Sequence, residues 1–153
     1  MATWTAHATV GAHPDEVLAV LTDPAAIEQW APIPFEVDEL DGPRLIAGSR
    51  ARVSGCLAGR RLGFDIAVRH ADGEGLELVA SGPVDIDVVY DLLPAVGGTG
   101  VHASISVRGC GFTGRLLAKA TEALLAGGAL HHAIARIARA VEATTSTRTA
   151  VAA

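Results

Sequence analysis

Two polar side chains lie on faces that are otherwise apolar, and they are the residues best suited to act chemically on a bound ligand. Tyr90, the only tyrosine of the chain, falls on the apolar side of the alternating segment VDIDVVYDLLP. Its hydroxyl could donate a hydrogen bond to a ligand carbonyl or enolate, or to the backbone around a core ring. His131 lies at the edge of an apolar helical face, where an imidazole could act as acid or base. The alternative is a boundary histidine that faces water. Tyr90 and His131 are therefore the candidate catalytic residues.

The charged clusters of the sequence are explained more simply by a solvated surface than by catalysis. Asp85, Asp87 and Asp91 alternate with apolar residues and so predict the outer side of a strand. The one basic cluster either pairs with acidic residues on neighbouring strands or binds an anionic group at the rim of a pocket, and the first interpretation is preferred. This cluster consists of Arg50, Arg52, Arg60 and Arg61.

The spacing of histidines and cysteines predicts neither a metal site nor a redox centre. His131 and His132 point about 100° apart on a helix, and no histidine or glutamate four residues away completes a ligand pair. Cys56 and Cys110 fit no metal or redox spacing, so we expect reduced, semi-buried thiols. We expect no metal and no other cofactor.

The size and composition of the chain predict one globular domain. A chain of this length buries roughly 70% of its unfolded surface as a single unit, and we place the domain at residues 1–146, with a flexible tail at 147–153. The net charge of −5 argues against nucleic acid as a partner. The N-terminus lacks the pattern of a signal peptide, and no apolar run is long enough to span a membrane. We expect a cytoplasmic protein, either a monomer or a homodimer.

Hydrophobic periodicity predicts an α+β arrangement. Two short helices beginning at Pro14 and Pro24 follow the first strand, and a helical period runs from Thr113 to about Ala143. Short links between most of the strands predict an antiparallel meander. The predicted strands are residues 3–10, 35–40, 49–59, 60–70, 76–81, 84–94 and 101–109.

A strongly curved sheet cannot seat a straight helix along its full length, so we expect a cavity between them. Trp30 would form a wall at its mouth, with a plain structural role as the close alternative. Gly127 and Gly128 cost about 1 kcal/mol each inside a helix, so the helix is broken, kinked or widened there, or the backbone passes close to something. A kinked or widened helix is preferred. The remaining predicted ligand-binding residues are Phe35, Val37, Phe64, Val88 and Leu124.

Two segments and the C-terminal helix resemble one superfamily. HPDEVLAVLTDPAAIEQWAP and YDLLPAVGGTGVHASI resemble the START/Bet v 1-like (SRPBCC) superfamily, in particular its polyketide cyclase/dehydrase and lipid transport branch. The resemblance covers residues 3–143. It implies a helix-grip fold, in which a seven-stranded curved antiparallel sheet wraps around a long C-terminal helix with a ligand cavity between them.

The resemblance implies a hydrophobic small-molecule ligand, polyketide or lipid-like. One hypothesis is a cofactor-independent polyketide cyclase/dehydratase that uses Tyr90 and His131 as polar contacts. The other is a non-catalytic carrier or sequestering protein, and a third, weaker one is an interaction module. An enzyme needs at least two polar groups that converge on one ligand atom, whereas a carrier needs only volume.

Overall fold

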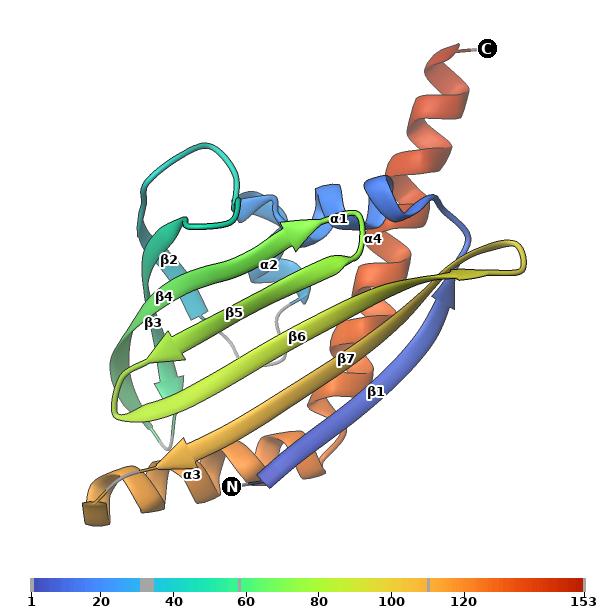
Figure 1. The fold of residues 1–153 in the computed structure, drawn as a ribbon. Coiled ribbons are helices and arrows are strands. Elements are labelled where there is room, and N and C mark those ends of the chain that lie inside the picture. Colours follow the sequence, from blue (N-terminus) through green and yellow to red (C-terminus); the bar gives the residue numbers. More distant parts are fainter. Residues whose placement is uncertain (1, 31–34, 58, 110, 153) are drawn as a thin grey trace.

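A curved antiparallel sheet carries the helices on its concave side (Figure 1). The computed structural model describes residues 2–30, 35–57, 59–109 and 111–152, without the side chains of residues 2, 28–30, 57, 124 and 144–152. The strands are β1 (Ala2–Val10), β2 (Phe35–Leu40), β3 (Arg50–Leu57), β4 (Arg60–Asp72), β5 (Gly75–Ser81), β6 (Val84–Ala95) and β7 (Gly98–Gly109). The helices are α1 (Pro14–Leu21), α2 (Pro24–Trp30), α3 (Gly111–Ala126) and α4 (Ala129–Ala152).

The order of strands confirms the predicted meander. The seven strands follow the order β1-β7-β6-β5-β4-β3-β2, and all neighbours pair antiparallel. Strands β2 to β7 therefore lie next to their neighbours in sequence, while β1 crosses to pair with β7. Two short helices follow β1, and helical structure ends the chain, so the α+β helix-grip architecture is confirmed.

The convex face of the sheet is polar, as the alternation of residues predicts. Asp87 and Asp91 are exposed on this face of β6. Arg52 and Asp65 form an ion pair at 3.4 Å across β3 and β4, and Arg61 reaches Glu36 at 3.2 Å. The prediction that the basic cluster pairs across strands is thus confirmed for these two arginines. Pairs this exposed contribute little, about 0–1 kcal/mol each.

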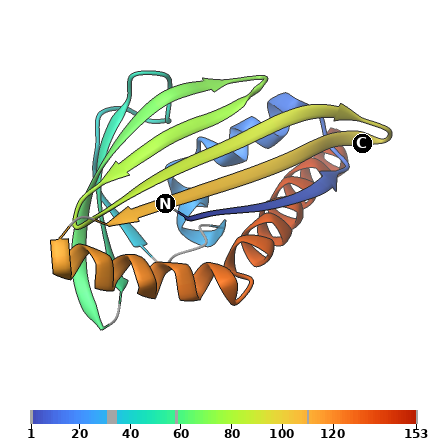
Figure 2. The ribbon, with the colours of Figure 1, turned by 60° about the horizontal axis from the view of Figure 1, so that its bottom comes forward.

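The C-terminal helical segment is broken at Gly127–Gly128. Gly128 has φ 91°, a left-handed conformation that ends α3 and that residues with a Cβ rarely adopt. The prediction of one continuous helix, kinked or widened at these glycines, is therefore wrong, because α3 and α4 are separate helices. Close packing is not the reason for the glycine, because a Cβ at Gly128 would meet nothing within 4 Å. Figure 2 shows α3 and α4 meeting at a sharp bend.

The broken helix covers two separate parts of the sheet. Helix α3 packs against β6, β7, β1 and β3, while α4 packs mainly against β1 and also against β7, α1 and α2 (Figure 2). Helix α4 continues to Ala152, beyond the apolar period that ends near Ala143. None of the helices within the described residues has the length and apolarity needed to cross a membrane.

Candidate functional site

The concave face of the sheet is built from rows of side chains that run across paired strands. One row joins Leu76, Tyr90, Ala103 and Ala6, which are direct neighbours on β5, β6, β7 and β1. Every one of them is at most 4% exposed. This Tyr90 row is sealed, because α1 packs against β4, β5, β6 and β7 and α4 packs against β1.

The next row along the strands behaves differently. Val88 pairs with Leu78 on β5 and with Ile105 on β7, and Ile105 pairs with Trp4 on β1. This Val88 row lies two residues from the Tyr90 row, about 7 Å along the strand. Leu78, Val88 and Trp4 are partly exposed, although Ile105 between them is 1% exposed. The middle of the concave face therefore keeps accessible apolar surface.

The partly exposed surface extends toward the β2 edge. Ile66 on β4, Leu62 on β4 and Phe35 and Val37 on β2 also keep accessible surface while they pack against the core. Leu62 and Phe35 both pair with Gly55 on β3, so they share one side of the sheet. A glycine between two apolar side chains leaves room above the strand. The candidate site is the open concave surface of Phe35, Val37, Leu62, Ile66, Leu78 and Val88.

The predicted pocket residues divide into three groups. Phe35, Val37 and Val88 lie on the open surface, as expected for a lining. Phe64 faces the same side but is only 7% exposed, because it is packed into the core. The side chains of Trp30 and Leu124 lie outside the described residues, so the wall formed by Trp30 stays a prediction.

The two predicted catalytic residues are placed in different surroundings. Tyr90 is 0% exposed within the sealed row, and burial raises the pKa of its hydroxyl well above the ordinary value. His131 is exposed near the start of α4, whose buried stripe is formed by Leu130, Ala133, Ile134, Ile137 and Val141. His131 therefore lies off the face that packs against the sheet, which agrees with the alternative of a boundary histidine that faces water. The structure does not bring these two side chains together on one accessible surface.

The two glycines belong to a turn rather than to a pocket wall within a helix. Gly127 is exposed, and its backbone nitrogen donates to the Ala123 carbonyl oxygen at 3.0 Å, while the Gly128 nitrogen donates to Leu125 at 3.1 Å. These bonds close the end of α3. Their effect on the site is indirect: the turn changes the direction of the chain, so α4 runs at an angle to α3.

Leu62, Ile66 and Leu78 were not among the predicted lining residues. In the sequence of β4, Leu62, Phe64 and Ile66 stand at alternate positions, a pattern that predicts one shared face. The periodicity does not indicate which positions of that face the helices leave uncovered. That property depends on contacts between elements distant in sequence.

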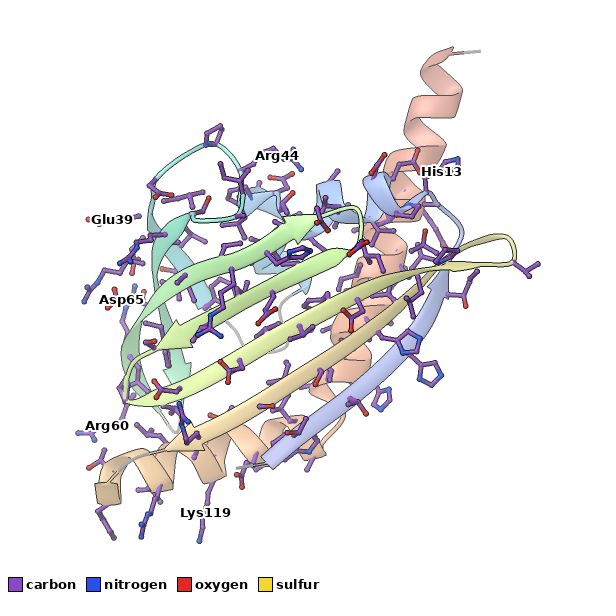
Figure 3. All side chains as sticks on the ribbon, viewed as in Figure 1. His13, Glu39, Arg44, Arg60, Asp65 and Lys119 are labelled. Atoms are coloured by element: carbon purple, nitrogen blue, oxygen red, sulfur yellow. The ribbon has the colours of Figure 1, made fainter. Side chains whose placement is uncertain are left out.

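A hollow of about 510 Å³ lies over β2, β3 and β4, and its lining includes apolar residues, among them Leu40 and the Ile66 of the candidate site. Its lining combines arginines with acidic side chains, and one pair, Arg52 with Asp65, is already joined. Figure 3 shows Asp65 and Glu39 at this edge of the sheet, pointing away from the helices. The hollow is open, and a hydrophobic ligand there would have to displace water from its charged side chains, which is unfavourable.

Three potential metal ligands meet in the β4–β5 hairpin. Atoms of His70, Asp72 and Glu74 lie within 4.8 Å of one another. However, Asp72 Oδ1 accepts hydrogen bonds from the Glu74 backbone nitrogen and from His70 Nε2, both at 2.8 Å. The backbone bond and the nearby histidine hold the pKa of Asp72 below its usual value. The cluster is thus accounted for by the turn itself.

The thiol expected to be semi-buried is exposed. Cys56 is a free cysteine on β3, next to Arg61 of β4, on the outer side of the sheet. The expectation of a semi-buried position is wrong for Cys56, because the covered face of β3 is the one that carries Val53. Cys110 lies outside the described residues.

Several solved structures are similar to this chain over nearly its whole length. TTHA0849 from Thermus thermophilus is 18% identical with a TM-score of 0.69, covering 94% of this chain and 99% of that one. Ara h 8.0201 is 11% identical with a TM-score of 0.61, covering 93% and 98%. DynU16, from the dynemicin biosynthetic locus, is 22% identical with a TM-score of 0.58, covering 92% of this chain and 47% of its own.

These similarities show the fold. The chain has the helix-grip fold that its strand order and helices indicate, and at 11–22% identity the similarities extend to the fold alone. No family model matches the sequence, and no curated protein matches it either.

Proposed function

We propose that the protein binds a hydrophobic small molecule, polyketide or lipid-like, in a cavity between the concave face of the sheet and the helices. The observation that carries this proposal is the open Val88 row. Apolar side chains in the middle of a covered sheet keep accessible surface, which in a well-packed core they would lose. Accessible apolar side chains on a covered face favour apolar ligands, because burying the two against each other removes apolar surface from water.

The composition of the open surface supports binding without catalysis as the first candidate. Its six residues are all aliphatic or aromatic, and the predicted catalytic pair is not assembled on it. A carrier or sequestering protein needs only such volume. Electrostatic stabilisation of a reaction would need polar donors directed at the reacting atoms.

Cyclase- or dehydratase-like chemistry is the second candidate. It rests on Tyr90, one row from Val88 on the same strand and the same side, and on the similarity to DynU16 from a biosynthetic locus. The hydroxyl would act on a ligand only after the sealed row opens. If Tyr90→Phe retained ligand but lost turnover of that ligand, this candidate would replace the first.

Native mass spectrometry of the purified protein, followed by denaturing extraction, tests the proposal. We expect a co-purified hydrophobic molecule, or binding of a fatty acid or polyketide mimic added afterwards. Val88→Trp should reduce the occupancy at least tenfold by filling the cavity. Val89→Trp is the matched control, because Val89 is the next residue on β6 and faces the convex side. A wild-type protein that stays empty with every mimic, or an occupancy that Val88→Trp leaves unchanged, overturns the proposal.

A further inference from the structure

Helix α3 presents two large apolar side chains to solvent. Phe112 is 87% exposed and Leu116 is 58% exposed, one helical turn apart. The opposite side of the helix is packed into the domain through Leu117, Thr121 and Leu125. The apolar pair is therefore not needed for the packing of α3. Leaving a phenylalanine and a leucine side by side in water calls for a partner.

Basic side chains share the exposed face with these apolar residues. Arg115 and Lys119 follow Phe112 at three and seven positions, so all of them lie on one side of the helix together with Leu116. Both basic residues are exposed, and Figure 3 shows Lys119 projecting from α3 away from the sheet. We call Phe112, Arg115, Leu116 and Lys119 the α3 patch.

The charge of the patch is opposite to that of the whole chain. The protein has a net charge of −5, yet the only acidic residue of α3 is Glu122, which is half-buried and turned about 80° from Phe112. Arg60, at the start of β4, lies at the same end of the molecule (Figure 3). The patch therefore combines apolar anchors with local positive charge.

From this combination we infer that the α3 patch docks the protein on an anionic lipid surface. Phe112 and Leu116 would enter the boundary between headgroups and acyl chains, while Arg115 and Lys119 contact acidic headgroups. Basic helices with exposed phenylalanine and leucine bind membrane surfaces in this way. A protein partner fits less well, because a stable interface buries about 800 Å² per partner around an apolar centre. A lipid surface needs no complementary shape.

Docking is independent of the proposed cavity, but the two would cooperate. A protein that carries a hydrophobic molecule must collect or deliver it where such molecules dissolve, and membranes are such a place. Binding by two apolar anchors and two charges is weak and reversible, since even one acyl chain gives only marginal binding. The protein can then leave the membrane again after it has docked.

Sedimentation with vesicles tests the inference on the full chain. Vesicles of phosphatidylcholine with an equal share of phosphatidylserine should bind the protein, and vesicles of phosphatidylcholine alone should bind it much less. Phe112→Ser with Leu116→Ser should weaken binding about tenfold or more. Arg115→Gln with Lys119→Gln should weaken it about 25-fold at low salt, roughly fivefold for each charge. High salt should release the wild-type protein.

A second exposed apolar pair provides the matched control. Leu93 is 47% exposed and Val96 is 102% exposed at the β6–β7 hairpin, at the other end of the molecule from the start of α3 (Figure 1). Leu93→Ser with Val96→Ser should leave vesicle binding unchanged. All these positions are exposed, so circular dichroism should show folded variants.

Three outcomes would overturn the inference. The first is no binding to anionic vesicles, and the second is binding that the α3 substitutions do not weaken more than the hairpin substitutions do. The third is self-association in analytical ultracentrifugation that Phe112→Ser with Leu116→Ser abolishes while vesicle binding persists. That third result would assign the patch to a second copy of the chain.

Discussion

The Tyr90 row and the Val88 row are neighbours on the same strands and the same face, yet one is sealed and the other is open. Both are apolar and both face the helices. The difference comes from the helices, since α1 covers the end of the sheet that holds Tyr90, while the bend at Gly128 directs α4 toward β1. The covering helices thus decide which part of this face stays accessible, and the strand sequences only make the face apolar.

The largest effect should come from removing a large side chain from the sealed row. We expect Tyr90→Ala to lower the free energy of unfolding by about 3–5 kcal/mol, because the ring leaves a void among fully packed neighbours. Val88→Ala should lower it by about 1 kcal/mol or less, because part of the valine already faces open space. Urea unfolding measures both. Equal losses at the two positions would show that the rows are packed alike.

The opposite change, adding volume, should distinguish two residues within the Val88 row, Ile105 and Val88. Ile105→Trp overpacks a position that is 1% exposed, so we expect a loss of about 1–3 kcal/mol. Val88→Trp should be tolerated with a loss below about 1 kcal/mol, since the new ring has room. Thermal unfolding of the two variants measures this difference. If Val88→Trp were the more damaging substitution, there would be no open space above Val88.

The pH dependence of stability should report the sealing of the Tyr90 row. Burial raises the pKa of Tyr90 in the folded state, so the folded protein holds its proton at a pH where the unfolded chain has lost it. The stabilisation is complete below the unfolded pKa of about 10 and falls by about 1.4 kcal/mol per pH unit above it.

Tyr90 is the only tyrosine, so the ultraviolet absorbance of tyrosinate follows this single group. In the native protein the signal should appear only at a pH where unfolding begins, whereas in denaturant it should appear near about pH 10. Tyr90→Phe should remove this part of the pH dependence. Ionisation at that same ordinary pH in the folded protein would mean that solvent reaches the hydroxyl.

The smallest effect should come from the turn that separates the helices. We expect Gly128→Ala to lower the free energy of unfolding by about 1 kcal/mol, since alanine is strained at φ 91° even though space is free. Gly127→Ala is the control. Chemical denaturation checks both, and an unchanged stability of Gly128→Ala would mean that α3 and α4 can join into a continuous helix.

The sequence allowed the strands, the meander from β2 to β7 and the two faces of the sheet to be predicted, because alternation and short turns are local signals. The candidate site could be predicted only in part. Val88 and Phe35, predicted to line a pocket, keep accessible surface, whereas Phe64, on the same side, is nearly buried. His131 was assigned to the edge of a helical face whose buried stripe begins at Leu130. Adjacent helical positions differ by about 100° around the helix axis. The periodicity alone does not determine the rotation of the helix closely enough to decide which of Leu130 and His131 faces the sheet.

The pairing of β1 with β7 has a consequence for how the chain reaches this structure. Thr3 and Ser106 share a hydrogen bond at 3.0 Å although 103 positions separate them, and among the described strands β1 has only β7 as a neighbour. Strands β2 to β7 can pair with sequence neighbours as soon as each hairpin is complete. Strand β1, which is synthesised before the other strands of this sheet, must instead wait for β7. Closure of this long loop should limit the folding rate, because contacts between distant residues form slowly.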